Sequence, residues 1–348
     1  MQLHVQPSRS GIAAFSIVIA LVLGIVDYLT GPYFSLTVFY LFPVALAAWY
    51  IGRRAAILVS IFCALVWTIA DIGSFGTNLS LALDLWNSIV RFSFFMIVSY
   101  TLTSTRRAID RENALAKEIQ HSLLPVSLPR IQGIEISTVY RPAAVLSGDY
   151  FDILPTGEGD LVVCIADVAG KGPGPALLMA NLQATVRALV LAGRSPADLC
   201  GEINRFVVEH GVPSRIITFF ICRIDRERTR LEYANAGHNP PILVRADGSQ
   251  LLLSEGGLVL GVSVAARYVQ AEVPVHPGDN LVLYTDGLTE AQNRRGEEFG
   301  LKRLIHVLAG NGGASAGRLK ARLIEEAHRF HYGTFQDDMT LVILSLGG

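Results

Sequence analysis

Four apolar stretches occupy most of the first 103 residues, and they constrain this chain more than any other feature of its sequence. They cover approximately residues 11–30, 33–51, 55–72 and 82–103. Because about 20 apolar residues cross the hydrocarbon core of a bilayer, each stretch is long enough to span a membrane. The first is too long for the apolar part of a signal peptide and lacks a small-residue cleavage site, so we expect it to remain attached. We therefore predict a transmembrane region of four helices over 1–103.

The remainder of the chain has the composition of a soluble domain. Overall, 51% of the residues are hydrophobic and 17% are charged, whereas about 25% are charged in typical soluble proteins. Nearly all of the apolar excess precedes residue 104. The net charge of −1 offers no basic patch, so we expect no nucleic-acid partner. No cysteine has a metal-binding spacing, and we expect all four to be reduced: Cys63, Cys164, Cys200 and Cys222.

Positively charged residues predict the orientation of the membrane region. Arginines occur before the first stretch, after the second and after the fourth, at Arg9, Arg53–Arg54 and Arg106–Arg107. With four spans they all lie on one side, which the positive-inside rule makes cytoplasmic. We therefore expect a multi-pass protein of the cell (inner) membrane, in contact with membrane lipid, with both termini and the soluble domain in the cytoplasm.

Three polar residues within the fourth stretch recur at helical spacing, namely Asp84, Asn87 and Arg91. Charges inside a membrane are costly, and they usually face a bundle interior or a ligand. One interpretation is that Asp84 is interfacial and that Arg91 snorkels or pairs with Asp27. The other interpretation is that Asp84 and Arg91 belong to a membrane sensing site.

Residues 104–125, which contain no glycine or proline until their end, connect the membrane region to the soluble domain. Ile109, Ala116, Ile119 and Leu123 recur at approximately heptad intervals, which suits a signalling helix that pairs with a second copy. An amphipathic helix packed on the soluble domain fits the pattern equally well. The sequence leaves open whether this connector forms a homodimer.

The soluble domain, predicted over 126–348, alternates β-rich runs with helical patterns. The runs at 216–224 and 229–236 are separated by charged turn residues, so we expect an antiparallel hairpin. The segment is long enough for one sizeable core. Further strands are expected at 134–140, 161–167, 280–286 and 340–346, and helices at 176–193, 197–210 and 317–331.

Aspartates stand at the ends of several apolar runs. One run leads through Tyr284 directly into Thr285, Asp286 and Gly287. A helix cap or a turn would explain a single Asp-Gly pair, but the pattern recurs. Asp167 follows a strand, Asp337 and Asp338 precede one, and Asp149 and Asp152 flank a short aromatic pair.

Carboxylates at strand ends that are distant in sequence can converge at one rim of a sheet. Like charges at close range raise each other's pKa, and a divalent cation relieves that repulsion. Hard oxygen donors without His or Cys clusters favour two Mg²⁺ or Mn²⁺ ions over zinc. The chain has no GxSxG nucleophile motif and no GxxxxGK[ST] phosphate loop. We therefore predict attack on a phosphoryl group by a metal-bound water or hydroxide.

Six segments together resemble the metal-dependent protein phosphatase superfamily (PPM), in its SpoIIE/RsbU-type branch. They are EIQHSLLP (118–125), SGDYFD (147–152), ADVAGKGPGPALLM (166–179), YANAGHNPP (233–241), YTDGLTEAQN (284–293) and QDDMTLVIL (336–344). The resemblance implies an α+β fold, a four-layer α-β-β-α sandwich of mainly antiparallel sheets with metals at one end. It implies that the metal-binding catalytic residues are Asp149, Asp167, Asp286 and Asp337, with the main-chain carbonyl of Val168 as a further ligand.

The resemblance also suggests roles for four other residues. Asp338, where the wider superfamily often has asparagine, would lie beside the metal ligands or face the substrate, as would Gly148. Animal members hold the substrate phosphate with an arginine, for which Arg141 is the nearest candidate in sequence. His238 would either protonate the leaving serine or order a turn before Pro240–Pro241.

The function implied by the resemblance is a serine/threonine protein phosphatase with two divalent cations, Mn²⁺ or Mg²⁺. Its substrate would be phosphoserine or phosphothreonine on a small STAS-domain anti-sigma factor antagonist. Many members stay inactive until a sensory domain, a partner or dimerisation orders the helix before the catalytic domain, a role that 104–125 fits. The alternatives are a membrane nucleotide cyclase, since SGDYFD is similar to GGDEF, and a catalytically inactive binding module.

Overall fold

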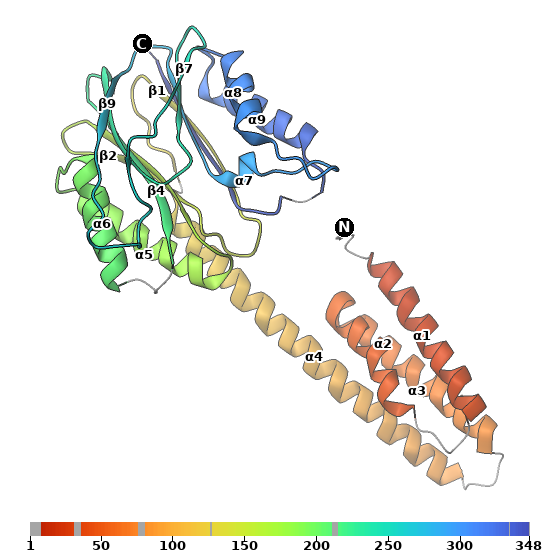
Figure 1. Cartoon of the computed structure of the whole chain (residues 1–348). Coiled ribbons are helices and arrows are strands. Elements are labelled where there is room, and N and C mark those ends of the chain that lie inside the picture. The colour runs from red at the N-terminus through yellow and green to blue at the C-terminus, as the bar shows by residue number, and fades with distance from the viewer. Residues whose placement is uncertain are drawn as a thin grey trace. The chain divides into compact units, whose positions relative to one another are not determined.

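The computed structural model describes residues 8–30, 36–75, 81–125, 127–210, 215–333 and 335–347. Contacts divide the chain into two compact units, Met1–Asn113 and Ala114–Gly348. The division falls within one helix, because α4 runs from Leu81 to Leu123, as Figure 1 shows. The segment 104–125, predicted as a connector, therefore lies largely in the last turns of α4.

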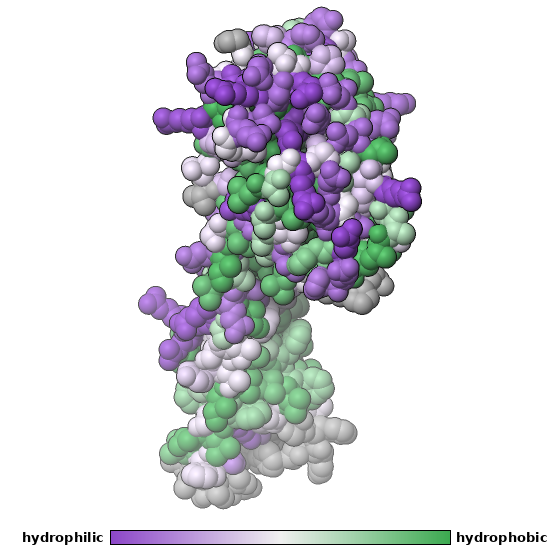
Figure 2. All heavy atoms as spheres, turned by 90° about the vertical axis from the view of Figure 1, so that its left-hand side faces the viewer, coloured by the Kyte–Doolittle hydropathy of each residue, from purple (hydrophilic) through white to green (hydrophobic). Residues whose placement is uncertain are grey.

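The first unit consists of helices with an apolar surface. Among the residues that the structure describes, three helices are long and apolar enough to cross a membrane, namely α1 (Arg9–Thr30), α3 (Arg53–Phe75) and α4. Large apolar side chains on their outer faces are more than half exposed, including Leu29, Leu58, Ile69 and Trp86. Figure 2 shows hydrophobic side chains over this unit and mainly hydrophilic side chains over the other.

The stretch predicted as a span over 33–51 forms a shorter helix. It consists of the 3₁₀ turn η2 (Thr37–Tyr40), helix α2 (Leu41–Leu46) and the π-helical turn η3 (Ala47–Ile51), while 33–35 lie outside the described residues. Gly52, with a φ of 119°, ends it. At about 1.5 Å per residue, 37–51 covers roughly 22 Å, less than the hydrocarbon thickness of about 30 Å. The four predicted spans thus correspond to three helices of spanning length and a shorter one.

A row of mostly small residues lets α1 pack closely against α3. The buried positions of α1 recur every three or four residues, which defines one helical face. A Cβ atom at Gly24, within this face, would lie 2.3 Å from the side chain of Val66 in α3, so the contact requires glycine. The buried residues of α1 are Ile12, Ser16, Ala20, Gly24 and Asp27.

The second unit is a sandwich of two sheets. The strand orders are β1–β11–β10–β6–β7 and β2–β3–β4–β5–β8, with β9 also paired to β5. Among the described strands, β5 and β8 pair in parallel, and the other neighbours pair antiparallel. The strands are β1 (Ile134–Arg141), β2 (Tyr150–Pro155), β3 (Leu161–Val168), β4 (Ile217–Ile224), β5 (Arg230–Ala236), β6 (Ile242–Val244), β7 (Gln250–Leu252), β8 (Gly256–Gly257), β9 (Ala271–Pro274), β10 (Asn280–Tyr284) and β11 (Met339–Leu346).

Helices cover the outer faces of both sheets, as Figure 1 shows. Helices α5 (Pro173–Val190) and α6 (Pro196–His210) pack on the second sheet, and α9 (Ala316–Phe330) packs on the first beside α8 (Gly300–Ala309). Alternate residues of β11 face different cores, since Val342 and Leu344 contact the core between the sheets whereas Leu341 and Ile343 contact the core beneath α8 and α9. These layers confirm the predicted α-β-β-α sandwich.

The predicted hairpin over 216–236 is confirmed, because β4 and β5 pair antiparallel. The carboxylate of Asp225 closes the turn, accepting hydrogen bonds from the backbone N–H groups of Thr229 and Arg230 at 2.8 and 3.0 Å. Arg228 occupies the left-handed region there, with a φ of 57°. The sequence analysis overlooked β2, the short strands β6 to β9 and the helix α8.

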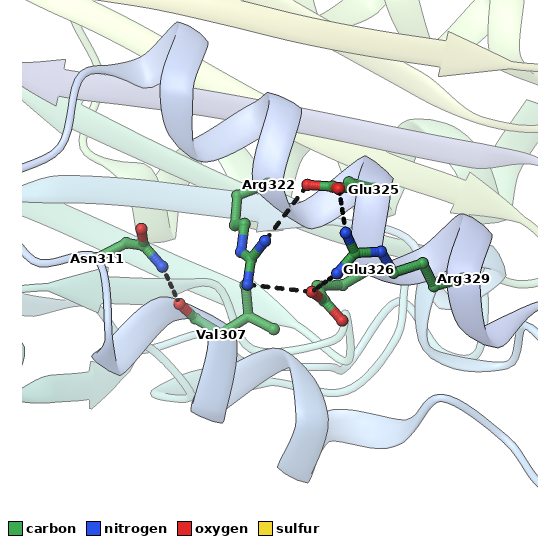
Figure 3. Close-up of polar contacts among 6 residues, drawn as sticks. All are labelled: Val307, Asn311, Arg322, Glu325, Glu326 and Arg329. Carbon is green, nitrogen blue, oxygen red and sulfur yellow. Dashed lines mark hydrogen bonds and ion pairs between the residues drawn. The ribbon is translucent and has the colours of Figure 1, made fainter.

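Surface ion pairs join successive turns of α9. Figure 3 shows Arg322 and Arg329 each contacting both Glu325 and Glu326. Exposed pairs of this kind contribute at most about 1 kcal/mol each. The helix is therefore held mainly by its buried face, which is formed by Ala316, Leu319, Leu323 and Ala327.

Candidate active site

The strand register places the predicted aspartates at strand ends that adjoin one another. In the second sheet, Tyr150 at the start of β2 pairs with Ala166 near the end of β3. In the first sheet, Tyr284 at the end of β10 pairs with Leu341 near the start of β11. Asp149 and Asp167 are adjacent to the first pair, whereas Asp286 follows Tyr284 by two positions and Asp337 precedes Leu341 by four.

Two threonine hydroxyl groups connect the sheets at Asp149. Thr285 and Thr340 donate to the same carboxylate oxygen of Asp149, at 2.8 and 2.6 Å. The backbone N–H of Thr340 also donates to the hydroxyl of Thr285, at 2.9 Å. The Thr-Asp-Gly sequence after β10 therefore does more than cap a turn, because Thr285 holds one predicted ligand and Asp286 is another. Asp286 also begins the short helix α7 (Asp286–Thr289).

Two glycines permit close backbone approaches at this end of the sandwich. A Cβ atom at Gly287 would lie 2.0 Å from the carbonyl oxygen of Asp338. A Cβ atom at Gly148 would lie 2.7 Å from the carbonyl oxygen of Val168 and 3.5 Å from Oδ1 of Asp167. Gly148 therefore lies directly against two groups that were predicted as metal ligands.

Asp338 holds the segment that precedes Asp149. Its Oδ1 accepts a hydrogen bond from the backbone N–H of Ala143 at 2.7 Å, and its Oδ2 accepts one from the N–H of Gly148 at 2.9 Å. Both carboxylate oxygens therefore bind main-chain donors. This arrangement places Asp338 beside the predicted ligands and gives it a positioning role.

Burial and mutual repulsion raise the pKa values of the clustered carboxyl groups. Burial, followed by the charges of Asp286 and Asp337, raises the pKa of Asp167 to about 7. Burial and the charge of Asp167 raise the pKa of Asp149 well above its usual range, although the two threonine hydroxyls oppose this shift. Burial and the charge of Asp337 also raise the pKa of Asp286. The site thus favours the binding of positive charge.

Lys171 is a cation at this site that the sequence analysis did not select. Its Nζ lies 3.1 Å from Oδ2 of Asp337 and donates to the carbonyl of Gln336 at 2.6 Å. Arg215 was also missed, and its guanidinium donates to the carbonyl of Ala169 at 2.8 Å. Lys171 lies within the ADVAGKGPGPALLM motif, which was the available signal for it, whereas Arg215 has no sequence signal of its own.

Gln120, near the end of α4, binds the loop that carries Asp149. Its side-chain nitrogen donates to the carbonyl of Ser147 at 2.8 Å, and the N–H of Ser147 donates to its side-chain oxygen at 3.0 Å. Gln183 of α5 also donates to the carbonyl of Leu123 at 3.0 Å. The last turns of α4 thus pack on the sandwich, as one of the two interpretations of the connector expected. The EIQHSLLP motif was the available signal for Gln120.

His238 is buried with both ring nitrogens in hydrogen bonds. Its Nδ1 lies 2.8 Å from the hydroxyl of Thr218, and its Nε2 lies 3.2 Å from the carbonyl of Tyr284. Burial lowers its pKa to about 4, so the ring is neutral at pH 7. Because a carbonyl only accepts, Nε2 carries the hydrogen and Nδ1 accepts from Thr218. These bonds fit the expected role of His238 in ordering a turn.

The remaining acidic and basic candidates lie in different settings. Arg141 ends β1, is exposed, and lies with its Nη1 2.8 Å from Nε2 of His328. Asp152 is buried in an ion pair of 2.7 Å with Arg187 of α5. Asp152, the second aspartate of SGDYFD, is therefore a buried residue whose ion-pair partner comes from α5.

The polar residues of the fourth apolar stretch separate in the structure. Arg91 forms an ion pair with Asp71 of α3, whereas the sequence had suggested Asp27 as its partner. Asn87 is exposed, and the side chain of Asp84 lies outside the part of the chain that the structure describes. Helical spacing identified a shared face, but it does not specify which neighbouring helix supplies the partner.

The donor set of the acidic site fits hard divalent cations. Asp149, Asp167, Asp286, Asp337 and the Val168 carbonyl offer only oxygen atoms, which Mg²⁺ and Mn²⁺ prefer. Any side chain at Gly148 would fill the space against that carbonyl oxygen. Across the described ranges, no three His, Cys, Asp or Glu side chains are placed closely enough to hold a metal ion together.

The fold and the acidic end of the sandwich define the class of domain. The structure matches the SiaA-PP2C domain of Pseudomonas aeruginosa with a TM-score of 0.61 and 21% identity, over 69% of this chain and 98% of that chain. The second unit thus has a PP2C-type fold. The family model for stage II sporulation protein E (SpoIIE) matches residues 157–347, and the chain belongs to this family.

Two relatives differ in how much of their own length is matched. The phosphoserine phosphatase RsbU of Bacillus subtilis is 30% identical over 249 residues, which are 70% of this chain and 72% of RsbU. Protein IcfG of Synechocystis sp. is 30% identical over 257 residues, which are 65% of this chain but 40% of IcfG. The chain therefore spans less than half the length of that relative.

Proposed function

We propose that this protein is a metal-dependent protein serine/threonine phosphatase, which hydrolyses phosphoserine or phosphothreonine on a cytoplasmic regulator. The observation that carries the proposal is the clustering of mutually repelling aspartates at one end of a PP2C-type sandwich. The name of its relative RsbU, a phosphoserine phosphatase, supports the same chemistry. The fold and family favour this function over the nucleotide cyclase considered from sequence.

The acidic cluster would hold two divalent cations, Mn²⁺ or Mg²⁺. The proposed ligands are Asp149, Asp167, Asp286, Asp337 and the carbonyl of Val168. Such ions supply a nucleophilic water at neutral pH and neutralise charge on a phosphoryl group. Without bound cations, these carboxylates would repel a phosphate ester.

Other residues of the site position groups or provide charge. Thr285 and Thr340 fix the orientation of Asp149, and Asp338 fixes the loop before it. The exposed ammonium group of Lys171 offers positive charge beside Asp337 for a substrate phosphate. Arg141 is a further candidate for that contact.

The test is the release of phosphate from a phosphoserine peptide by the full-length protein. We expect activity with Mn²⁺, its loss on chelation, and a loss of at least about 100-fold in Asp286→Asn, since a metal ligand is removed. The matched control is Asp247→Asn, because Asp247 is an exposed turn residue. Full activity after chelation, or in Asp286→Asn, would show that the proposed mechanism is wrong.

For the substrate we propose a phosphorylated STAS-domain anti-sigma factor antagonist, as the family resemblance implies. Incubation with a phosphorylated STAS protein from the host, followed by intact-protein mass spectrometry, should show the loss of one phosphate from serine or threonine. Unchanged STAS protein, together with hydrolysis of the phosphoserine peptide, would reject this substrate class while leaving the phosphatase activity established.

We further propose that the first unit lies in the cell (inner) membrane with both termini cytoplasmic. The three long apolar helices support this location. If the shorter helix 37–51 also crosses, Arg9, Arg53–Arg54 and Arg106–Arg107 share one side, as the positive-inside rule requires. Labelling of single cysteines at 9 and 53 by a membrane-impermeant maleimide in intact cells should fail at both. Labelling at 53 but not at 9 would show that the shorter helix 37–51 does not cross the membrane.

The last part of α4 would regulate the phosphatase, through a homodimer or through its contact with the sandwich. The hydrogen bonds between Gln120 and Ser147 support the second route. Analytical ultracentrifugation of residues 104–348 at several concentrations distinguishes the routes, because only the first predicts dimerisation.

A further inference from the structure

The helical unit contains a buried polar cluster that the phosphatase chemistry does not use. Asp27 of α1 is 7% exposed, and Tyr40 of η2 is 0% exposed. Within the described residues, Oδ2 of Asp27 and the hydroxyl of Tyr40 both lack a hydrogen-bond partner. Because buried polar atoms are nearly always satisfied, two unsatisfied oxygens in one cluster indicate a missing ligand.

The hydroxyl of Tyr40 lies close to the turn of α1 that carries Asp27. A Cβ atom at Gly24, one helical turn before Asp27, would lie 3.7 Å from the hydroxyl oxygen of Tyr40. Tyr40 and Asp27 are also close enough to interact electrostatically. The backbone N–H of Leu36 binds the Asp27 carboxylate, so its other oxygen remains available.

The charges around Asp27 do not balance. Asp71 of α3 is paired with Arg91 of α4, and both interact electrostatically with Asp27. The other titratable group beside Tyr40 among the described side chains is the thiol of Cys63. Among the side chains that the structure describes, one guanidinium therefore faces two carboxylates, which leaves one excess negative charge when Asp27 is ionised.

We propose that the helical unit binds one small monovalent cation, a proton or an alkali metal ion, between Asp27 and Tyr40. A single positive charge would compensate the excess carboxylate, whose burial without compensation is costly. An alkali ion would also bind both unsatisfied oxygens, whereas a proton would satisfy Oδ2 of Asp27. An anion is unsuitable because the free atoms are oxygens and the net charge is negative.

Packing connects this site to a natural spectroscopic probe. The ring of Tyr40 stacks on Trp67 with centroids 5.6 Å apart, and the guanidinium of Arg91 lies 3.8 Å from the centre of the Trp67 ring. All three tryptophans of the chain, Trp49, Trp67 and Trp86, belong to the first unit. Intrinsic tryptophan fluorescence of the full-length protein therefore reports on this unit alone.

The test measures tryptophan emission of the full-length protein in detergent, in two arms. In one arm LiCl, NaCl or KCl replaces choline chloride at fixed pH and ionic strength. In the other arm the pH changes in choline chloride alone. A saturable change in the first arm identifies an alkali ion, and one confined to the second identifies a proton.

Asp27→Asn should abolish the response or shift its midpoint at least tenfold in cation or proton concentration, and Tyr40→Phe should weaken it. Asp110→Asn, which changes an exposed carboxylate of α4, should respond like the wild type. If Asp27→Asn does not fold, as judged by circular dichroism, Tyr40→Phe decides the test. No saturable response in either arm of the wild type, or an unchanged midpoint in both variants, would overturn the proposal.

Discussion

Gln120 and the main chain of Ser147 hold each other through two hydrogen bonds of 2.8 and 3.0 Å. The hydroxyl of Ser147 in turn accepts a hydrogen bond from the N–H of Asp149 at 3.0 Å. The end of helix α4 is therefore bonded, through one residue, to a proposed metal ligand.

Gln120→Ala should raise the Mn²⁺ concentration needed for half-maximal phosphatase activity at least about fivefold. The substitution leaves two buried main-chain groups of Ser147 unsatisfied, which typically costs about 1–3 kcal/mol and loosens the loop before Asp149. Gln132→Ala is the control, because Gln132 is exposed. An unchanged Mn²⁺ requirement in Gln120→Ala would contradict a positioning role.

Metal-free protein should lose stability as the pH rises from about 4 to about 7. The pKa of Asp167 is raised to about 7 in the folded protein from the usual 3.8 of an aspartate, so over this window the folded state binds a proton that the unfolded chain releases. Asp167→Asn cannot ionise, and in chelator at pH 8 it should melt about 2 °C or more above the wild type. Near pH 4 the melting temperatures of the wild type and Asp167→Asn should differ little.

With Mn²⁺ added at pH 8, the wild type should melt at a higher temperature than Asp167→Asn, because ion binding stabilises the wild type more than the variant. Thermal unfolding followed by circular dichroism measures both effects. A difference in melting temperature that is the same at pH 4 and pH 8 would refute the electrostatic explanation.

Thr340→Val should lower activity at least about tenfold, since it removes the 2.6 Å hydrogen bond to a buried carboxylate, an interaction of about 1–3 kcal/mol. Thr340→Ser keeps the hydroxyl and should restore most of the activity. Thr185→Val on the exposed face of α5 is a matched control for the same change. Equal activity in Thr340→Val and Thr340→Ser would exclude this role of the hydroxyl.

Gly148→Ala should fold but bind Mn²⁺ poorly, because its Cβ atom would meet the carbonyl oxygen of Val168 at 2.7 Å. Isothermal titration calorimetry with Mn²⁺ measures the loss, for which we expect at least tenfold. Gly157→Ala is the control, since no atom lies within 4 Å of a Cβ there. Wild-type affinity in Gly148→Ala would show that Val168 is not a ligand.

The central strands and their terminal aspartates were predictable from the sequence because burial on both faces leaves long apolar runs. β3 and β11 show this, and each has Asp167 or Asp337 at the predicted end. The strands β6 to β9 contain two to four residues each, too few for a period to be recognised. Helix α8 did carry a signal, since Leu304 and Leu308 recur at helical spacing on its buried face.

Contacts between distant segments were not predictable in the same way. Nothing local to Lys171 or Thr340 indicates its partner, because these contacts depend on the register and on the approach of two sheets. The pairing of Arg91 with Asp71 likewise depends on how α3 packs against α4. A single sequence specifies the face on which a side chain lies better than it specifies what meets that face.

The two main-chain bonds to Asp338 have a consequence for how this site can vary. A carboxylate accepts on both of its oxygens, whereas an asparagine would present an amide donor to one of the two N–H groups. A relative with asparagine at this position must therefore route the 143–148 loop differently or leave an N–H to water. The residue at 338 and the path of a loop 190 residues away in sequence should consequently change together.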